Sequence, residues 1–300
     1  MLAAGTEWAS FSSATAGRPT SAIFSRSRIA DDLDPRRITV RESRDSPDNP
    51  NSTAIIVGLD VTGSMGVIAD NLARTGLGTL VGEILDRKPV PDPHIAFMGI
   101  GDAWCDRYPL QVTQFEADIR IAATLKDLYL EKGGGGNSYK SYNLPWYFAA
   151  RHTSIDCFER RGRKGYLFTV GDEEAPPVLL ASHIREVIGD EAARDISTPD
   201  LLAMASRTYN VFHCVIEQGS YASACLDKVL DSWHAVLGQR VLRVGDYDRL
   251  PEVIVSAIEV TEGRDHRDVA RSWPGSTTRV VGRAIANLPA ASPGTGIVRF

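Results

Sequence analysis

The stretch AIIVGLDVTGSMG, residues 54–66, decides how the rest of the chain is interpreted. Its first half is a continuous apolar run, which is typical of a β-strand covered on both faces. Its second half places one carboxylate and two hydroxyls, on Asp60, Thr62 and Ser64, directly after that strand. A buried strand that ends in oxygen-bearing side chains indicates a ligand site at its carboxyl end.

The composition is that of an ordinary globular protein and excludes some classes of partner. The chain has 300 residues, of which 43% are hydrophobic, enough to bury a full core. Its formal net charge is −5 and its isoelectric point is about 5.7. Such a chain has no general attraction for nucleic-acid phosphates or anionic lipid, so we expect neither nucleic acid nor membrane as a partner.

Cysteine spacing and the apolar runs indicate the cellular compartment. The four cysteines are far apart and form no CxxC pair, which does not favour a zinc site and fits a reducing compartment. No apolar run approaches the roughly 20 residues of a membrane helix. The N-terminal segment lacks the compact hydrophobic stretch of a secretory signal and is only weakly similar to an organelle transit peptide. We therefore predict a cytoplasmic protein.

The chain divides into three parts. Residues 1–52 are rich in small polar residues and predict a flexible leader with a short strand near 37–43. Residues 53–262 form the regular domain. Residues 263–300 carry six arginines against two aspartates and predict a tail or a strap on the domain, with a docking segment for a partner as the alternative.

Within residues 53–262, strand-like and helix-like segments alternate. Apolar runs predict strands, and helical spacing of apolar residues predicts helices between them. This alternation predicts a Rossmann-like, doubly wound α/β fold with a mostly parallel central sheet flanked by helices. Right-handed crossovers then place the loops that follow the strands on one edge of the sheet, where open sheets bind ligands.

The loop after the first long strand offers hard oxygen donors. Asp60 supplies a carboxylate, and Thr62 and Ser64 supply neutral hydroxyls. Mg²⁺ prefers such donors in octahedral geometry and commonly keeps several waters. A site with few charged ligands leaves one coordination position open, and a carboxylate from another molecule would fill it.

The pattern D-x-T-G-S-M, starting at Asp60, resembles the metal-ion-dependent adhesion site (MIDAS) of von Willebrand factor A (vWA) domains, whose usual form is D-x-S-x-S. The resemblance covers roughly residues 53–262 in the order of elements. In that family the first-loop hydroxyls bind the metal directly, and the first-loop aspartate often acts through water. A threonine from a second loop and an aspartate from a third loop complete the site.

The second and third loops stand in the order that the family requires, with departures. The segment KGGGGNSYKSY (132–142) has no threonine, so Asn137 or Ser138 would have to replace it. The segment LFTVGDE (167–173) places Asp172 at the third-loop position, without the usual flanking threonine and glycine. The metal ligands that the resemblance implies are Asp60, Thr62, Ser64 and Asp172, with Asn137 or Ser138.

The resemblance implies a binding module and not an enzyme. The expected cofactor is Mg²⁺ (or Mn²⁺), and the expected partner is a protein that presents a carboxylate to the metal. Because no secretory signal is evident, the chain is similar to intracellular bacterial vWA proteins of multi-protein systems. For that group an AAA+ ATPase is an expected partner.

Two other functions are open. A hydrolase of the haloacid dehalogenase (HAD) type also starts its signature with an aspartate at a strand tip, here Asp60, and Lys164 is the candidate for its lysine. That chemistry needs a second aspartate as general acid, but position 62 is threonine. The altered second loop would also suit a structural subunit with a degenerate metal site.

Some residues have plainer interpretations. Thr62 and Ser64 could cap the helix that follows them, and His213, inside a strand, is expected to be structural. Asp102 and Asp106 follow the second strand; they could hold the rim or bind a second cation, but are expected mainly to be solvated. The pair Glu173 and Glu174 would make the rim negative, which favours a partner with basic residues around one key acid.

Overall fold

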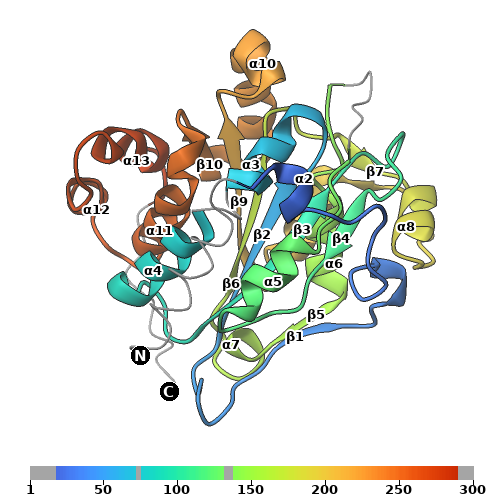
Figure 1. Ribbon diagram of the computed structural model, residues 1–300, viewed down its shortest axis with the longest axis horizontal. Helices are drawn as coiled ribbons and strands as arrows, with labels where there is room; N and C mark the ends of the chain where they lie inside the picture. The colour runs from blue at the N-terminus through green and yellow to red at the C-terminus, as the bar shows by residue number, and fades with distance from the viewer. Residues whose placement is uncertain (1–17, 72–75, 132–137, 290–300) are drawn as a thin grey trace, which may run out of the picture.

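The computed structural model describes residues 18–71, 76–131 and 138–289. Its centre is a six-stranded sheet in which five strands run parallel and the edge strand β4 is antiparallel to β3 (Figure 1). The order across the sheet is β10-β9-β6-β2-β3-β4. The strands are β2 (Thr53–Asp60), β3 (Pro93–Ile100), β4 (Leu110–Val112), β6 (Gly165–Gly171), β9 (Tyr209–Ile216) and β10 (Val241–Val244). This confirms the predicted doubly wound α/β class.

The strand order creates a switch point between β2 and β6. Chain order runs outward from β2 to β3 and β4 on one side, and from β6 to β9 and β10 on the other. The loops that leave β2 and β6 therefore diverge to opposite sides, and a crevice at their carboxyl ends is where such sheets bind ligands. The Asp60 loop and the Asp172 loop are the two loops at this point.

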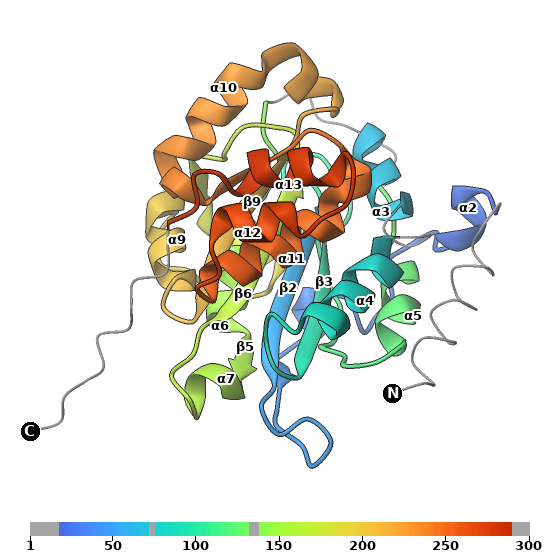
Figure 2. The same cartoon turned by 90° about the vertical axis from the view of Figure 1, so that its left-hand side faces the viewer.

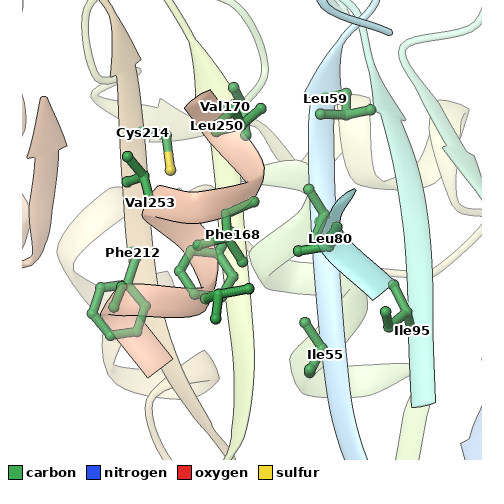
Figure 3. Packing of buried hydrophobic residues seen from close by; sticks show 14 of the residues in the cluster. Ile55, Leu59, Leu80, Ile95, Phe168, Val170, Phe212, Cys214, Leu250 and Val253 are labelled. Atoms are coloured by element: carbon green, nitrogen blue, oxygen red, sulfur yellow. The ribbon is translucent and has the colours of Figure 1, made fainter. Parts of the chain in front are cut away.

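Helices cover both faces of the sheet because the strands are apolar on both sides. Along β2, Ile55, Val57 and Leu59 join one buried cluster, whereas Ala54 and Ile56 join the other. Figure 3 shows the first cluster, in which side chains of β2, β3, β6 and β9 pack under α4 and α11. Both clusters are continuous across the sheet, so the strands hold their carboxyl ends in fixed positions.

Two sets of helices form these layers. The first face is covered by α3 (Gly66–Asn71), α4 (Leu77–Arg87), α5 (Arg120–Lys126) and α11 (Leu250–Thr261). The second face is covered by α6 (Leu144–Arg151), α7 (Asp156–Glu159), α8 (Ala181–Val187), α9 (Thr198–Ala205) and α10 (Ser220–Leu237). The sequence predicts a helix from Tyr139 to about His152, which would contain Pro145. The structure accommodates this proline because α6 begins only one residue before it, where a missing N–H costs nothing.

The described part of the leader is packed against the domain. It contains α2 (Thr20–Ile23) and β1 (Arg41–Ser43), which pairs with β5 (Thr153–Ile155). Ile23, Phe24 and Leu33 are buried in the first core cluster. The expectation of a flexible leader is therefore wrong for residues 18–52, because these apolar side chains are covered on folding.

The described part of the C-terminal segment forms two further helices, α12 (His266–Arg271) and α13 (Thr277–Ile285). Figure 2 shows them gathered with α11 on one side of the sheet. Val269, Trp273, Val281 and Ile285 are buried there. Residues 263–289 thus lie on the domain as a strap.

A short two-stranded sheet, β7 (Val178–Leu179) with β8 (Ile196–Ser197), lies beside the main sheet. Among the described residues, none of the helices combines the length and the apolar character that crossing a lipid bilayer requires.

Candidate functional site at the carboxyl edge of the sheet

Asp60 and Asp172 lie at the carboxyl ends of adjacent strands. Asp60 is the last residue of β2, and Asp172 directly follows β6. The two strands pair in parallel with Leu59 opposite Val170. Both aspartates are nearly inaccessible to solvent. The sequence prediction that these two residues meet at one edge therefore agrees with the sheet register.

Asp60 is surrounded by hydrogen-bond donors. Its Oδ1 accepts from the Thr62 backbone N–H at 2.9 Å and from the Thr62 hydroxyl at 2.6 Å. Its Oδ2 accepts from the Tyr142 hydroxyl at 2.8 Å. Burial raises the pKa of Asp60 to about 7, although the bonds from Thr62 and Tyr142 and the charge of Lys140 act in the opposite direction. A nearby positive charge is what this carboxylate needs in order to ionise fully.

Tyr142 connects the two strand ends. It is fully buried, and its pKa lies well above 10 because of burial and then the charges of Asp60, Glu173 and Asp172. Its ring meets His213 and Trp233 edge to face. The Tyr142 hydroxyl therefore stays protonated and donates to Asp60, while its ring packs in an aromatic layer with His213 and Trp233.

His213 belongs to this aromatic layer. Its ring stacks on Trp233 with centroids 3.5 Å apart, and its Nδ1 lies 2.8 Å from the Thr169 hydroxyl. Burial lowers its pKa well below 6.5, so the ring is neutral. This agrees with the prediction of a structural histidine.

Asp172 is placed by close backbone approach. Its Oδ2 accepts from the Tyr221 backbone N–H at 2.8 Å, near the start of α10. A Cβ on Gly219 would lie 2.2 Å from the Asp172 Cβ, and a Cβ on Gly171 would lie 2.1 Å from the Tyr142 hydroxyl oxygen. Only glycine fits at these two positions without moving a site residue.

Lys140 is a buried lysine at the same edge. It is 2% exposed, and its ammonium donates to Glu173 Oε1 at 2.8 Å. Burial lowers its pKa, but the bond and charge of Glu173 and the charges of Asp60 and Asp102 outweigh burial and raise it. The ammonium therefore remains charged among these carboxyl groups.

The predicted second-loop ligands are only partly described. Asn137 lies outside the described residues. Ser138 is half-buried, and its carbonyl accepts from the Glu174 backbone N–H at 3.0 Å. The Ser138 hydroxyl also bonds the Glu174 carboxylate. Burial acts to raise the pKa of Glu174, but its hydrogen bonds, including this one, lower it. Ser138 is thus engaged with Glu174.

The first-loop hydroxyls differ in how far they are described. Thr62 is buried and donates its proton to Asp60 instead of capping a helix. Its lone pairs can face a cation, because the hydroxyl proton is used elsewhere. Ser64 lies in the short 3-10 helix η2 (Gly63–Met65), and its side chain lies outside the described part.

The expectation that Asp102 is solvated is wrong. Asp102 is buried, and its Oδ1 accepts from the Trp104 backbone N–H at 3.0 Å. Asp106 in turn accepts from the Asp102 N–H at 2.7 Å. These bonds fix the loop after β3, because a buried carboxylate is stable only where donors satisfy it.

The rim is also less negative than the sequence suggested. Glu173 pairs with Lys140, and Glu174 pairs with Lys228 at 2.8 Å. Two lysines distant in sequence therefore balance the two glutamates.

The lysine considered for a HAD-like hydrolase is at the wrong end of the sheet. Lys164 directly precedes β6, and its ammonium donates to the Ser206 carbonyl. Asp60 lies at the carboxyl end of the neighbouring parallel strand. The length of β6, about 3.3 Å per residue, separates them, so Lys164 cannot assist chemistry at Asp60.

Three exposed apolar side chains lie on segments that follow strands of the main sheet. Val67 lies in α3 after the Asp60 loop, Trp104 lies in the loop after β3, and Val178 starts β7 after the Asp172 loop. Trp104 is 61% exposed, and its ring edge meets His183. Exposed aromatic and aliphatic side chains around a polar centre are typical of protein-binding surfaces.

The donor set fits a divalent cation in its chemistry. Within the described ranges, no three His, Cys, Asp or Glu side chains form a metal-binding group. Mg²⁺ and Mn²⁺ prefer hard oxygen ligands such as carboxylates and hydroxyls. Asp60, Thr62 and Asp172 supply such oxygens at the switch point. The charge of Asp60 also acts on the buried Lys140 ammonium, which pairs with Glu173.

Sequence reasoning missed four residues that shape the site. Lys140 and Tyr142 follow the glycine run, while Gly219 and Tyr221 open α10 far along the chain. The alternation of Lys140 and Tyr142 around one residue could have indicated that both face the strand ends. Nothing local marks the other two, because their role depends on where α10 begins against β6.

Known proteins are similar to this chain in fold. No protein-family model matches the sequence, and no curated protein matches it. Similar solved structures include the pilus adhesin SpaC of Lactobacillus rhamnosus GG in its open conformation. Its TM-score is 0.47 and its identity 9%, over 73% of this chain and 31% of the adhesin chain.

A second similar structure is described as von Willebrand factor type A from Catenulispora acidiphila. Its TM-score is 0.40 and its identity 14%, over 72% of this chain and 44% of that chain. This chain thus covers less than half of either protein. The similarity to both structures concerns only the path of the backbone.

Proposed function

We propose that this chain is a vWA-like protein-interaction module that binds its partner at the carboxyl edge of the sheet. The observation that supports this most is the position of buried Asp60 and Asp172 at the carboxyl ends of two adjacent parallel strands, at the switch point. Exposed Val67, Trp104 and Val178 lie on the elements around them. A buried acidic centre with an apolar surround suits a protein partner better than a small substrate.

The finer proposal is that Mg²⁺ or Mn²⁺ links the module to its partner. Thr62 and Ser64 would hold the cation by their hydroxyls, and Asp60 and Asp172 would stabilise it, directly or through water. Ser138 or Asn137 would complete the set. When bound, the cation offers an open position to an acidic side chain of the partner.

Trp104 is proposed as the main apolar contact. A large exposed aromatic ring contributes strongly when a partner covers it, and tryptophan is enriched among the residues that dominate binding energy. The ring sits on a loop that Asp102 and Asp106 hold in place. A rigid loop costs little ordering entropy on binding.

The proposed partner is a protein that presents a carboxylate, within an intracellular multi-protein system. An AAA+ ATPase is the first class to try, on the strength of the motif resemblance.

The test is capture of partners by the intact chain from cells that make it, in MgCl₂ and in EDTA, with the first captured protein then purified for binding measurements. We expect Asp60→Ala and EDTA each to remove the same partner. Trp104→Ala should weaken its binding by about 2 kcal/mol or more. The matched control is Val40→Ala, which also removes an exposed apolar side chain. Val40 precedes β1, and β1 and β5 lie at the other end of the sheet from α3 and β7 (Figure 1).

Partner binding that survives both Asp60→Ala and Trp104→Ala would contradict the proposal. Hydrolysis of a generic phosphoester by the intact chain but not by Asp60→Ala would instead favour the HAD-like alternative.

A further inference from the structure

A charged lysine is buried where the acidic loops meet. Lys140 is 2% exposed and pairs with Glu173, which is itself mostly buried. The other carboxyl groups whose charges act on its ammonium are Asp60 and Asp102. An ammonium is stable in such a place only when negative groups repay its lost hydration.

The three carboxyl groups come from three different loops. Asp60 ends β2, Asp102 follows β3, and Glu173 follows β6. Lys140 comes from the segment after the glycine run, so one ammonium pairs directly with the third of these loops and interacts through its charge with the other two. A bound divalent cation would have the same electrostatic effect.

The acidic group retains capacity for a further cation. Glu173 Oε2 is buried and has no hydrogen-bond partner among the described residues. One ammonium therefore leaves a buried carboxylate oxygen unsatisfied.

We propose that Lys140 is the built-in cation of the carboxyl edge, which holds the acidic loops together and competes with a divalent cation for them. The inference depends on the proposed function in one respect, the choice of Mg²⁺ or Mn²⁺ as the competing ion. It predicts that the intact chain binds divalent cations weakly and keeps its fold without them.

The experiment compares intact protein with Lys140→Met, Lys140→Gln and Lys140→Arg. Thermal unfolding is measured in EDTA and in millimolar MgCl₂ or MnCl₂, and Mn²⁺ affinity is measured by calorimetry. The matched control is Lys228→Met, which removes the lysine paired with the adjacent Glu174. Lys228 is mostly exposed, so its loss changes little.

The neutral variants should melt at least about 5 °C lower than the intact chain in EDTA. Divalent ions should restore most of that loss, and their affinity should rise about tenfold or more, because a like charge no longer opposes them. Lys140→Arg should behave as the intact chain, and Lys228→Met should show no metal effect. Folding of Lys140→Met only in the presence of metal would also support the inference. In that case the melting temperature in EDTA is measured on Lys140→Gln instead.

The inference is overturned if the neutral variants are as stable as the intact chain in EDTA. It is also overturned if divalent ions restore none of the lost stability, or if all variants bind Mn²⁺ equally well. Partner capture does not enter these readouts. If divalent ions rescue the Lys140 variants but partner capture does not depend on metal, the inference holds and the proposed metal-dependent function is wrong. If capture depends on metal but the ions rescue nothing, the proposed function holds and the inference is wrong.

Discussion

Asp60 shows how a single carboxylate is held inside this molecule. Three hydrogen bonds reach its two oxygens, two from Thr62 and one from Tyr142. Thr62 is adjacent in sequence and its contacts form locally, whereas Tyr142 arrives from 82 positions away. The local bonds orient the carboxylate, and the distant one ties it to the second face of the sheet.

The contribution of the Tyr142–Asp60 hydrogen bond to stability can be measured by removing the tyrosine hydroxyl. Tyr142→Phe should lower the free energy of unfolding by about 1.5–3 kcal/mol, since it removes a hydrogen bond to an ionisable carboxyl group. Urea unfolding monitored by circular dichroism measures this loss.

The control for that variant is Tyr209→Phe. Tyr209 is equally buried and its hydroxyl lies 2.7 Å from the neutral hydroxyl of Thr153. Its loss should cost about 0.5–1.5 kcal/mol. Equal losses for the two variants would show that the bond to Asp60 has no special weight.

Helix α11 is the element that joins the strap to the sheet. Residues 250–260 are all buried, so the helix is covered on every side, as a core helix requires. Its buried Glu259 pairs with Arg264 and lies 3.5 Å from Arg87 of α4. The Arg87 guanidinium also stacks 3.4 Å above the Trp273 ring. Charge and ring contacts thus connect α4, α11 and the strap.

Trp273 tests whether the strap supports the domain. The ring is nearly inaccessible, and its Nε1–H donates to the buried Ser256 hydroxyl of α11 at 2.8 Å. Trp273→Ala should lower the free energy of unfolding by about 3–5 kcal/mol through a cavity and lost contacts. Thermal and urea unfolding measure the effect.

Arg279→Ala is the control on the same strap. Arg279 is exposed on α13, so its replacement should change stability by less than about 0.5 kcal/mol. A similar small effect for Trp273→Ala would mean that residues 263–289 are not needed for the domain to fold.

At the scale of the whole molecule, two buried titratable groups near the carboxyl edge act in opposite directions with pH. His213 has a pKa well below 6.5 because of burial. Asp60 has a pKa raised from 3.8 to about 7, also because of burial. At a pH between about 4 and 6.5, His213 is protonated more in the unfolded chain than in the folded chain. In the same range Asp60 is protonated more in the folded chain than in the unfolded chain.

His213 should make the protein less stable in acid. As the pH falls below about 6.5, only the unfolded chain protonates this ring, so the free energy of unfolding falls by up to about 1.4 kcal/mol per pH unit from this residue. Asp60 opposes the trend, because its folded form takes up a proton below about pH 7. The measurement is urea unfolding from pH 7.5 to 5 for the intact chain and His213→Phe.

The difference between those two curves isolates the histidine. His213→Phe keeps an aromatic ring against Trp233 but cannot titrate, so its stability should fall less, or rise, on acidification. The same pH slope for both proteins would show that His213 does not carry this effect.

Most of the architecture could be predicted from the sequence because its signals are local. The apolar run 54–60, the short strand expected within residues 109–115 and the helix expected near residues 222–238 were all marked by their own apolar residues, and the structure has β2, β4 and α10 there. Helix bounds were predicted less well: apolar spacing predicted a helix over residues 116–131, but α5 runs only from Arg120 to Lys126. The strap helices were not predicted, because their apolar residues are few and separated by arginines.

The candidate site divides in the same way. Asp60, Thr62 and Asp172 were found because each follows a buried strand, and strand ends of a parallel sheet share an edge. The ion pairs of Glu173 with Lys140 and of Glu174 with Lys228 were missed, since each lysine comes from a distant segment. The burial of Asp102 was missed because its bonds, although local, form within a loop whose covering depends on the folded chain. Metal binding by the first-loop residues stays a prediction.

Taken alone, the sequence determined which segments become strands and helices, and that oxygen-bearing side chains follow the strands, because backbone propensity and apolar spacing act over a few residues. Only the tertiary structure decided that Lys140 is buried among the acidic loops, that Tyr142 bonds Asp60, and that Gly219 makes room for Asp172. Those outcomes depend on charge, burial and close packing between residues tens of positions apart, and such energies arise only once the chain has folded.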